Sequence, residues 1–217
     1  MQALIFDLDG VIADTTEFHY QSWKRLTDEA GIPFTRDDNE QLRGITRRES
    51  LSRILNGRAI DEATAQTWLE LKNRYFLDSL DALQPLPGVV DFLQQAREAG
   101  LKMGIGSSSK NAHIVLKKLK LLEYFEAIGD GSTIVNSKPA PDVFLWVAGA
   151  LRTSPRQAIV FEDGEAGVEA ALAGGFWTVG IGAANLEQTH LVAPDGFANL
   201  TLESLLAYFA TLTDQTG

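Results

Sequence analysis

Two aspartates, Asp7 and Asp9, follow a short apolar run near the start of the chain and are separated by a single leucine. Burying a carboxylate is costly unless it is paired or bound to a metal. In one interpretation the strand simply ends here in an Asp-Gly turn at Gly10, which is a common hairpin signal. In the other, both acids lie at the carboxyl edge of a parallel sheet, where α/β proteins bind their ligands.

Further polar residues follow other apolar runs and favour the second interpretation. LKMGIG (101–106) is followed by Ser107, Ser108, Ser109 and Lys110, AIVFED (158–163) ends in Glu162 and Asp163, and NSKPAPD (136–142) contributes Lys138. The carboxyl ends of neighbouring parallel strands meet at one edge of a sheet, so these groups are expected to converge.

Phosphoryl transfer is the chemistry that these residue types suit. Carboxylate oxygens are preferred ligands of Mg²⁺, and an Asp carboxylate attacks phosphorus without needing a base to activate it. Mg²⁺ and Lys138 would offset the repulsion between the anions. Because residues i and i+2 of a strand share a face, Asp9 can approach the same reacting group as Asp7 and act as general acid and base.

The elements that must position these groups alternate between strands and helices. ALIF (3–6), LKMGIG, AIVFED and WTVGIG (177–182) are predicted as buried parallel strands, and EAIGDG (126–131) is a weaker candidate. Amphipathic helices are predicted at 89–100, closed by Gly100, and at 109–122. This alternation predicts an α/β fold with a Rossmann-like parallel sheet core.

About 90 residues separate the first strand from LKMGIG, whereas a crossover needs only about a dozen. Helix signals fill this segment. Asp14 with Glu17 and Thr46 with Glu49 resemble capping boxes, and Asp61 can cap a long helix. We therefore predict an inserted α-helical cap domain at 14–85, with residues 1–13 and 86–217 forming the catalytic core.

Composition excludes several classes of protein. The 217 residues carry a net charge of −10, which argues against a nucleic-acid partner, and there are no cysteines for disulfides or thiolate metal sites. No apolar stretch approaches the roughly 20 residues that span a bilayer, so no membrane partner is expected. The apolar strand begins without a signal-like segment, which favours a cytoplasmic protein. A phosphorylated substrate would require a local basic cluster.

Four ordered motifs resemble those of the haloacid dehalogenase superfamily of phosphotransferases. They are DLDGVIADT (7–15), SSSKN (107–111), SKPAPD (137–142) and FEDGEAGVEAA (161–171). Within the superfamily, SSSKN, QLRGITRRESL (41–51) and KNRY (72–75) are similar to stretches of the β-phosphoglucomutase family. The resemblance covers nearly the whole chain and is thin only in about the last 30 residues.

The resemblance implies a role for each matching residue. Asp7 would be the nucleophile that forms an aspartyl phosphate, and Asp9 the general acid and base. Mg²⁺ would be held by Asp7, the Asp9 carbonyl and Asp163, with Glu162 close by. The transferring phosphate would be held by Ser107, Ser108 and Lys138, and the second phosphate by Arg47, Ser109, Lys110 and Asn111. The sugar and cap closure would involve Thr15, His19, Trp23, Leu42, Arg43, Gly44, Ser50 and Lys72.

Some of these residues have a simpler interpretation beside the functional one. Trp23 fits the core of the cap as well as a sugar contact, and Lys72 fits an ordinary helix surface. By itself, His19 fits a partly buried polar residue, and only the resemblance favours a functional role for it. Position 43 departs from the family pattern, because Arg43 stands where a lysine is usual, and the two cations bind differently.

The resemblance implies a monomeric isomerase that interconverts β-D-glucose 1-phosphate and D-glucose 6-phosphate, with β-glucose 1,6-bisphosphate as intermediate and primer. The first alternative is a sugar-phosphate phosphatase that passes the same aspartyl phosphate to water, because the core motifs do not separate the two. The second is a phosphoacceptor module that is not an enzyme, against which the large cap and Asp9 both argue.

Overall fold

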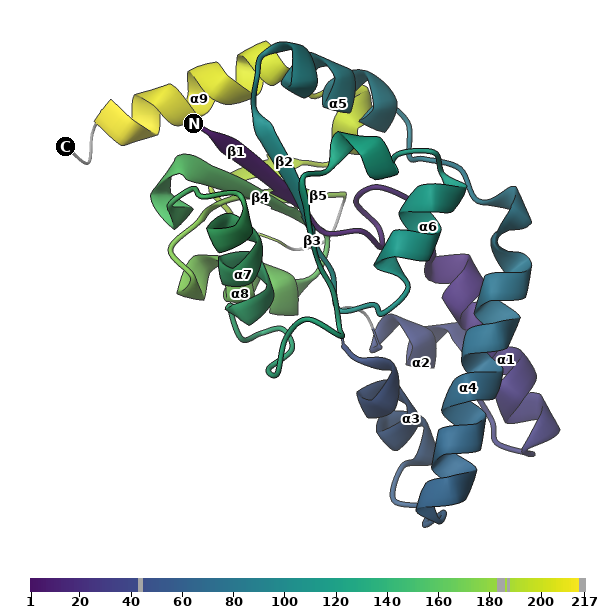
Figure 1. The fold of residues 1–217 in the computed structure, drawn as a ribbon. Helices are drawn as coiled ribbons and strands as arrows, with labels where there is room; N and C mark the ends of the chain where they lie inside the picture. Colours follow the sequence, from purple (N-terminus) through teal and green to yellow (C-terminus); the bar gives the residue numbers. More distant parts are fainter. Residues whose placement is uncertain (43–44, 183–185, 187, 215–217) are drawn as a thin grey trace.

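The fold is built on a six-stranded parallel sheet, which Figure 1 shows in the computed structural model of the chain. The structure describes residues 1–42, 45–182, 186 and 188–214. The strands are β1 (Ala3–Phe6), β2 (Lys102–Gly106), β3 (Ala127–Gly129), β4 (Ala158–Glu162), β5 (Trp177–Ile181) and β6 (Leu191–Ala193). Their order is β3-β2-β1-β4-β5-β6, and each neighbouring pair is parallel. The predicted Rossmann-like sheet is confirmed.

Helices cover both faces of the sheet. The α-helices are α1 (Thr16–Glu29), α2 (Arg36–Glu40), α3 (Arg47–Leu55), α4 (Glu62–Ser79), α5 (Val89–Glu98), α6 (Ala112–Lys118), α7 (Asp142–Ala150), α8 (Glu165–Ala173) and α9 (Leu202–Asp214), with single 3-10 turns at 80–82, 122–124, 155–157 and 196–198. In Figure 1, α5 and α9 lie on one face and α7 and α8 on the other.

The two faces follow from the alternation of side chains along β1. Leu4 and Phe6 belong to the cluster packed by α5, α6 and α9, whereas Ala3 and Ile5 belong to the cluster packed by α7 and α8. Both sets are fully buried. Because β1 is buried on both faces, its residues do not alternate between polar and apolar types. This explains the continuous apolar run in the sequence.

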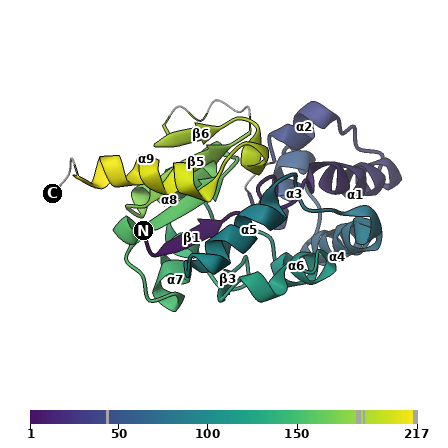
Figure 2. The same ribbon diagram turned by 90° about the horizontal axis from the view of Figure 1, so that it is seen from above.

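The segment between β1 and α5 is helical, as expected for a cap. Helices α1–α4 gather at one end of the molecule, away from α9 (Figure 2). Their own apolar core includes Trp23, Leu26, Leu51 and Leu69. The chain passes between sheet and helices twice, and Ala13 bridges to both Asp9 and Pro85 there. The domain limits at 13/14 and 85/86 stay predictions.

Helix starts in this segment are partly as predicted. Thr46 caps α3 by accepting from the backbone N–H of Glu49, and Asp61 caps α4 in the same way. The Asp14 capping box is wrong, because the N-cap of α1 is Thr15 and Asp14 accepts only from the Thr16 N–H. Glu17, its expected partner, instead binds Arg36.

Two elements of the core differ from their predictions. The helix expected at 109–122 covers only Ala112–Lys118, because residues 109–111 form a loop of serine-mediated turns. Strand β6 was not predicted, since three residues with one exposed position carry little periodic signal. None of the helices in the described ranges is long and apolar enough to cross a membrane.

Candidate active site

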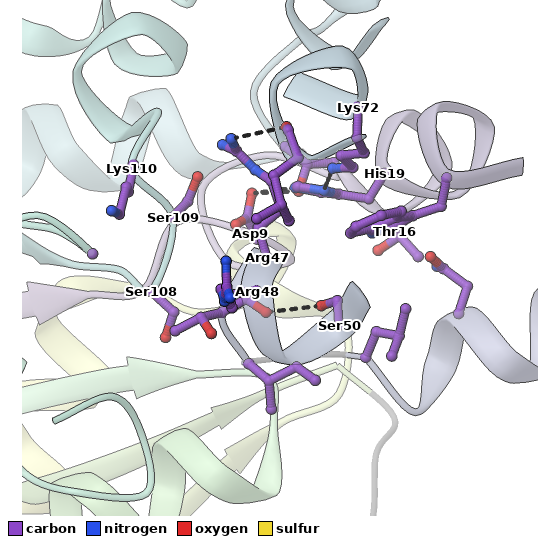
Figure 3. Close-up of a pocket in the computed structure, with 18 of the residues that line it drawn as sticks. Asp9, Thr16, His19, Arg47, Arg48, Ser50, Lys72, Ser108, Ser109 and Lys110 are labelled. Atoms are coloured by element: carbon purple, nitrogen blue, oxygen red, sulfur yellow. Dashed lines mark hydrogen bonds and ion pairs between the residues drawn. The ribbon is translucent and has the colours of Figure 1, made fainter. Parts of the chain in front are cut away.

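A cavity of about 530 Å³ lies where the ends of β1, β2 and β4 meet the cap helices. Since β1 lies between β2 and β4 and the chain order reverses there, this is the edge at which open parallel sheets bind ligands. The predicted residues that line the cavity are Asp7, Asp9, Thr15, His19, Trp23, Leu42, Arg47, Ser50, Lys72, Ser108, Ser109, Lys110, Glu162 and Asp163. Figure 3 shows groups from both the sheet domain and the cap around it.

Asp7, Lys138 and Glu162 form a buried charge cluster at the bottom of the site. Lys138 Nζ lies 2.5 Å from Asp7 Oδ1 and 2.5 Å from Glu162 Oε1, and the lysine side chain is 1% exposed. Glu162 Oε2 accepts the backbone N–H groups of Asp163 and Gly164. Glu162 thus uses both oxygens within the protein, whereas no hydrogen bond from a described residue reaches Asp7 Oδ2.

The charges in this cluster depend on one another. Burial raises the pKa of Asp7 well above its ordinary value, and the Lys138 ammonium opposes that shift. Against the cost of burial, Asp7 and Glu162 raise the pKa of Lys138, so the lysine stays protonated. A second cation beside Asp7 would stabilise its carboxylate further, which links ionisation of the nucleophile to occupation of the site by a cation.

The acids at this edge suit a divalent cation. One carboxylate oxygen each from Asp7, Glu162 and Asp163 lies within 4.8 Å of the others. The Asp9 carbonyl accepts no backbone hydrogen bond from the described residues. Hard oxygen donors in this arrangement fit Mg²⁺, which also keeps several waters. Both oxygens of Glu162 accept hydrogen bonds from Lys138 and from the Asp163 and Gly164 backbone. The set of Asp7, Asp163 and the Asp9 carbonyl stays the predicted ligand set.

Gly10 leaves room for one of these ligands, so Gly10→Ala is expected to weaken Mg²⁺ binding by at least about 10-fold. A Cβ at this position would lie 1.9 Å from Asp163 Oδ2, and its φ of +85° also disfavours alanine. Calorimetric titration with Mg²⁺ measures the loss. Gly57→Ala is the matched control, because its φ is +82° and a Cβ there meets nothing within 4 Å. Equal Mg²⁺ affinities in the two variants would contradict the expectation.

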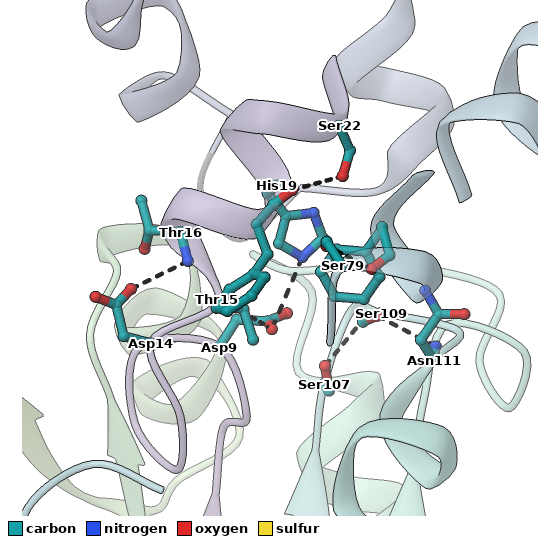
Figure 4. Close-up of polar contacts among 12 residues, drawn as sticks. Asp9, Asp14, Thr15, Thr16, His19, Ser22, Ser79, Ser107, Ser109 and Asn111 are labelled. Carbon is teal, nitrogen blue, oxygen red and sulfur yellow. Dashed lines mark hydrogen bonds and ion pairs between the residues drawn. The ribbon is translucent and has the colours of Figure 1, made fainter. Parts of the chain in front are cut away.

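Asp9 is held from the cap side. Its Oδ1 accepts a hydrogen bond of 2.5 Å from Thr15 Oγ1 and lies 3.8 Å from His19 Nε2 (Figure 4). Burial acts to raise the pKa of Asp9, but His19, Thr15 and Lys72 outweigh it and the net shift is downward. Asp9 is therefore a carboxylate in this arrangement, the form that can take a proton from an incoming hydroxyl.

Lys72 is buried, so its interpretation as ordinary helix surface is wrong. The residue is 1% exposed, its Nζ lies 2.6 Å from His19 Nδ1, and the ammonium faces the rings of Trp23 and Phe76. Burial lowers the pKa of Lys72 well below its ordinary value. If Lys72 donates to Nδ1, a neutral His19 carries its proton on Nε2, toward Asp9. Trp23 both packs in the cap core and lines the cavity.

His19 is expected to be neutral at pH 7. Burial lowers its pKa, Lys72 lowers it further, and Asp9 only partly opposes the shift. The unfolded chain protonates near the ordinary value of about 6.5, so stability is lost as pH falls below that value toward the lower folded pKa. Nitrogen chemical shifts of the ring measure the midpoint. Lys72→Met should raise it, and a midpoint at or above about 6.5 in the parent protein would contradict the assignment.

Some of the predicted phosphate-binding residues in the loop after β2 form hydrogen bonds within the protein. Ser107 Oγ accepts from the Ser109 N–H, and Ser109 Oγ accepts from the Asn111 N–H (Figure 4). The Asn111 amide donates to Asn73 Oδ1 on α4, 2.8 Å away. Ser107, Asn111 and Lys138 do not appear among the described residues that line the cavity. Ser108, Ser109 and Lys110 do line it.

Cations line the cavity on both sides. Among the described residues, Arg47 at the start of α3 donates a single long hydrogen bond of 3.5 Å, to Leu69 O. Partial burial lowers its pKa. Lys110 approaches from the loop after β2, opposite the cap (Figure 3). Arg48 instead pairs with Glu62 in an exposed ion pair. These residues provide the local positive charge that the acidic composition required.

The cavity also contains residues that were not predicted. They are Thr16, Asn39, Ile45, Thr46, Arg48, Gln66, Leu69, Glu70 and Gly131. Three of them, Gln66, Leu69 and Glu70, are spaced so that they share one face of α4. This spacing could have indicated that α4 lines the cavity. Nothing local distinguishes Asn39. The predicted residues Arg43 and Gly44 lie outside the described part of the chain.

The comparisons with known proteins point to sugar-phosphate enzymes. The β-phosphoglucomutase of Bacillus subtilis (strain 168) is 41% identical over 189 residues, covering 84% of each chain. A phosphorylated carbohydrates phosphatase of Thermotoga maritima is 31% identical, covering 81% of this chain and 82% of the relative. The crystal structure of a β-phosphoglucomutase from Clostridium difficile superposes with a TM-score of 0.93 at 35% identity, covering 98% and 99% of the two chains.

The family comparison agrees with the fold and with these relatives. The sequence profile of the haloacid dehalogenase-like hydrolases matches residues 4–181, which include β1 to β5 and the helical segment between β1 and α5. That range also contains all the carboxylates and lysines of the site just described. The chain is a phosphotransferase or hydrolase, and it belongs to the haloacid dehalogenase-like hydrolase family.

Proposed function

We propose that the protein is a β-phosphoglucomutase that interconverts β-D-glucose 1-phosphate and D-glucose 6-phosphate. The observation that carries the proposal is that cations from both the cap and the core surround one cavity beside Asp7. Lys138 pairs with Asp7, while Arg47 from the cap and Lys110 from the core line the cavity. We infer one phosphate subsite at Asp7 and Lys138 and a second at Arg47 and Lys110. A bisphosphate intermediate needs two such subsites, whereas a monophosphate needs one. The 41% identity to a β-phosphoglucomutase supports the same function.

In this mechanism the Asp7 carboxylate attacks the transferring phosphorus and forms an acyl phosphate. Asp7 Oδ2, which the described residues leave without a hydrogen bond, is the oxygen placed to attack. Lys138 and the Ser108 backbone and hydroxyl stabilise charge on the equatorial oxygens. Mg²⁺ at Asp7, Asp163 and the Asp9 carbonyl would neutralise part of the developing charge.

Asp9 moves the proton in each half of the cycle. As a carboxylate it takes the proton of the sugar hydroxyl that attacks the aspartyl phosphate, and it returns that proton to the leaving oxygen in the reverse step. Thr15 and His19 hold Asp9 in position. Closure of the cap over the sugar excludes water, which would otherwise hydrolyse the acyl phosphate.

The alternative is a phosphatase of sugar phosphates, which a 31% identical relative supports. Its core chemistry would be the same, with water as the acceptor. A paired assay separates the two functions. β-Glucose 1-phosphate, Mg²⁺ and a trace of β-glucose 1,6-bisphosphate are supplied, and glucose 6-phosphate and inorganic phosphate are followed together. The proposal requires glucose 6-phosphate to appear much faster than phosphate. A predominance of phosphate would establish the hydrolase instead.

Arg47→Ala tests the second phosphate subsite. We expect it to reduce transfer between sugar phosphates by about 100-fold, since a charge-assisted hydrogen bond is lost at each phosphate exchange. Hydrolysis of a small acyl or aryl phosphate, which carries no second phosphate, should change little. Arg58→Ala removes an exposed arginine from the same cap and serves as the control. Equal losses on both substrates would argue against a dedicated second subsite. The predictions of a monomer and of a cytoplasmic location stay predictions.

A further inference from the structure

Asn39 is a buried polar residue of the cap that lines the cavity. It lies in the last turn of the short helix α2, and only 6% of the residue is exposed. It belongs to none of the sequence motifs on which the site was predicted, and its neighbours in sequence, Asp38 and Glu40, are both exposed. A polar side chain that faces inward beside two charged surface residues calls for a partner.

The Asn39 amide has no such partner within the described part of the chain. Other buried polar groups of the cap are bonded: Ser50 Oγ donates to Thr46 O, and Thr27 Oγ1 donates to Trp23 O and Lys24 O. No unbonded side-chain nitrogen or oxygen among the described residues is completely sealed from solvent. The amide of Asn39 therefore keeps some access to solvent, and the residue lines the cavity.

The backbone of Asn39, not its side chain, maintains the local structure. Its N–H donates to Thr35 O, and its carbonyl accepts from the Leu42 N–H. Any residue provides these two bonds, and the helix start is secured separately by the capping box between Thr35 and Asp38. The side-chain amide makes no hydrogen bond to the described residues, so it adds none to the fold. A polar group that lines a cavity and makes no such bond is available to a ligand.

The chemistry of the amide indicates what the ligand offers. Cations are available for the phosphates, since Arg47 and Lys110 line the cavity and Lys138 pairs with Asp7. A neutral amide presents one acceptor oxygen and two donor hydrogens, which complement a hydroxyl that both donates and accepts. We propose that Asn39 binds a ring hydroxyl of the sugar and so helps to determine which sugar phosphate is accepted. This inference rests on the proposed function, because it needs a sugar phosphate in the cavity.

The test combines a side-chain deletion with hydroxyl deletions. Asn39→Leu keeps the size of the side chain and removes its donor and acceptor groups. The parent protein and the variant are compared on β-glucose 1-phosphate and on its 2-, 3- and 4-deoxy analogues, all of which keep the accepting 6-hydroxyl. For one analogue, the parent should lose about 10-fold in kcat/KM relative to the full sugar, as for one buried neutral hydrogen bond. The variant should lose nothing further on that analogue, while the other deletions should affect both proteins equally.

Thermal unfolding distinguishes a ligand-binding role from a structural one. Asn39→Leu should leave Tm nearly unchanged or raise it without ligand, because the amide makes no hydrogen bond to the described residues. Asn39→Ala should show the same loss of hydroxyl discrimination. Thr27→Val is the matched control. It removes a bonded buried hydroxyl of the cap, so it should lower Tm while leaving discrimination among the deoxy analogues unchanged.

Three outcomes overturn the inference or its basis, and they are separable. A parent protein that transfers no phosphoryl group to or from glucose phosphates refutes the proposed function itself. An active parent in which no hydroxyl deletion couples to Asn39 refutes the hydroxyl contact alone. A fall in Tm of Asn39→Leu comparable with that of Thr27→Val refutes the assignment of the amide to a ligand and makes it structural.

Discussion

Asp7→Asn is expected to abolish phosphoryl transfer, with a loss of at least about 10⁴-fold in kcat. An amide does not form the acyl phosphate, so every route through the enzyme is closed, including hydrolysis. The fold should survive the change, because Lys138 keeps its ion pair with Glu162. Rapid-quench assays with β-glucose 1,6-bisphosphate measure the loss, and acid-stable labelling of the protein measures the intermediate directly.

Asp14→Asn provides the matched control for this prediction. Asp14 belongs to the same motif, but it is exposed and accepts only the backbone N–H of Thr16. It should retain nearly all of the activity. Labelling or turnover by the Asp7 variant at more than about 1% of the parent rate would show that another residue carries the phosphoryl group.

Lys138→Met is expected to affect both stability and activity. The change leaves Asp7 and Glu162 buried side by side without their shared cation, since Lys138 is the one described residue that pairs with both. Removing one partner of a buried ion pair typically costs about 3–5 kcal/mol, a large part of the roughly 5–15 kcal/mol that stabilises a domain. Transfer should fall by at least about 100-fold, because the transferring phosphoryl group loses a charge that stabilises it.

Denaturant unfolding with and without Mg²⁺ measures the first effect. The destabilisation should be smaller with Mg²⁺, because a cation at Asp7 replaces part of the lost charge. Lys118→Met is the control, since its ion pair with Asp81 is exposed and should contribute little to stability. A Lys138 variant as stable as the Lys118 variant would contradict the strong coupling inferred for this cluster.

The motifs at the strand ends were predictable because each depends on short stretches of sequence. The buried run before Asp7, the Glu162-Asp163 pair after β4 and the serines after β2 each follow a strand whose existence is fixed by local apolar pattern. Parallel pairing then brings the strand ends to one edge. The helix starts at Thr46 and Asp61 were predictable for the same reason, since a cap and its acceptor lie within one turn.

Other features depend on contacts between distant segments. Lys72 is a typical surface residue by sequence. Its burial follows from the packing of α1 against α4, which brings His19 and Trp23 to it beside Phe76 of α4. The ion pair of Glu162 Oε1 depends on Lys138, 24 residues away. Asp14 failed as a cap because the chain leaves the sheet through a bridge at Ala13 before α1 begins.

By itself, the sequence determined the order of strands and helices, the chemistry at the strand ends and the resemblance that implies a sugar-phosphate enzyme. These properties are local or recur as short motifs. Only the tertiary structure decided which polar groups form hydrogen bonds within the protein, as Ser107 and Glu162 do. It also decided which polar residues are buried but line the cavity, as Asn39 does. The reason is that hydrogen-bond satisfaction depends on every neighbour in space, most of which lie far away along the chain.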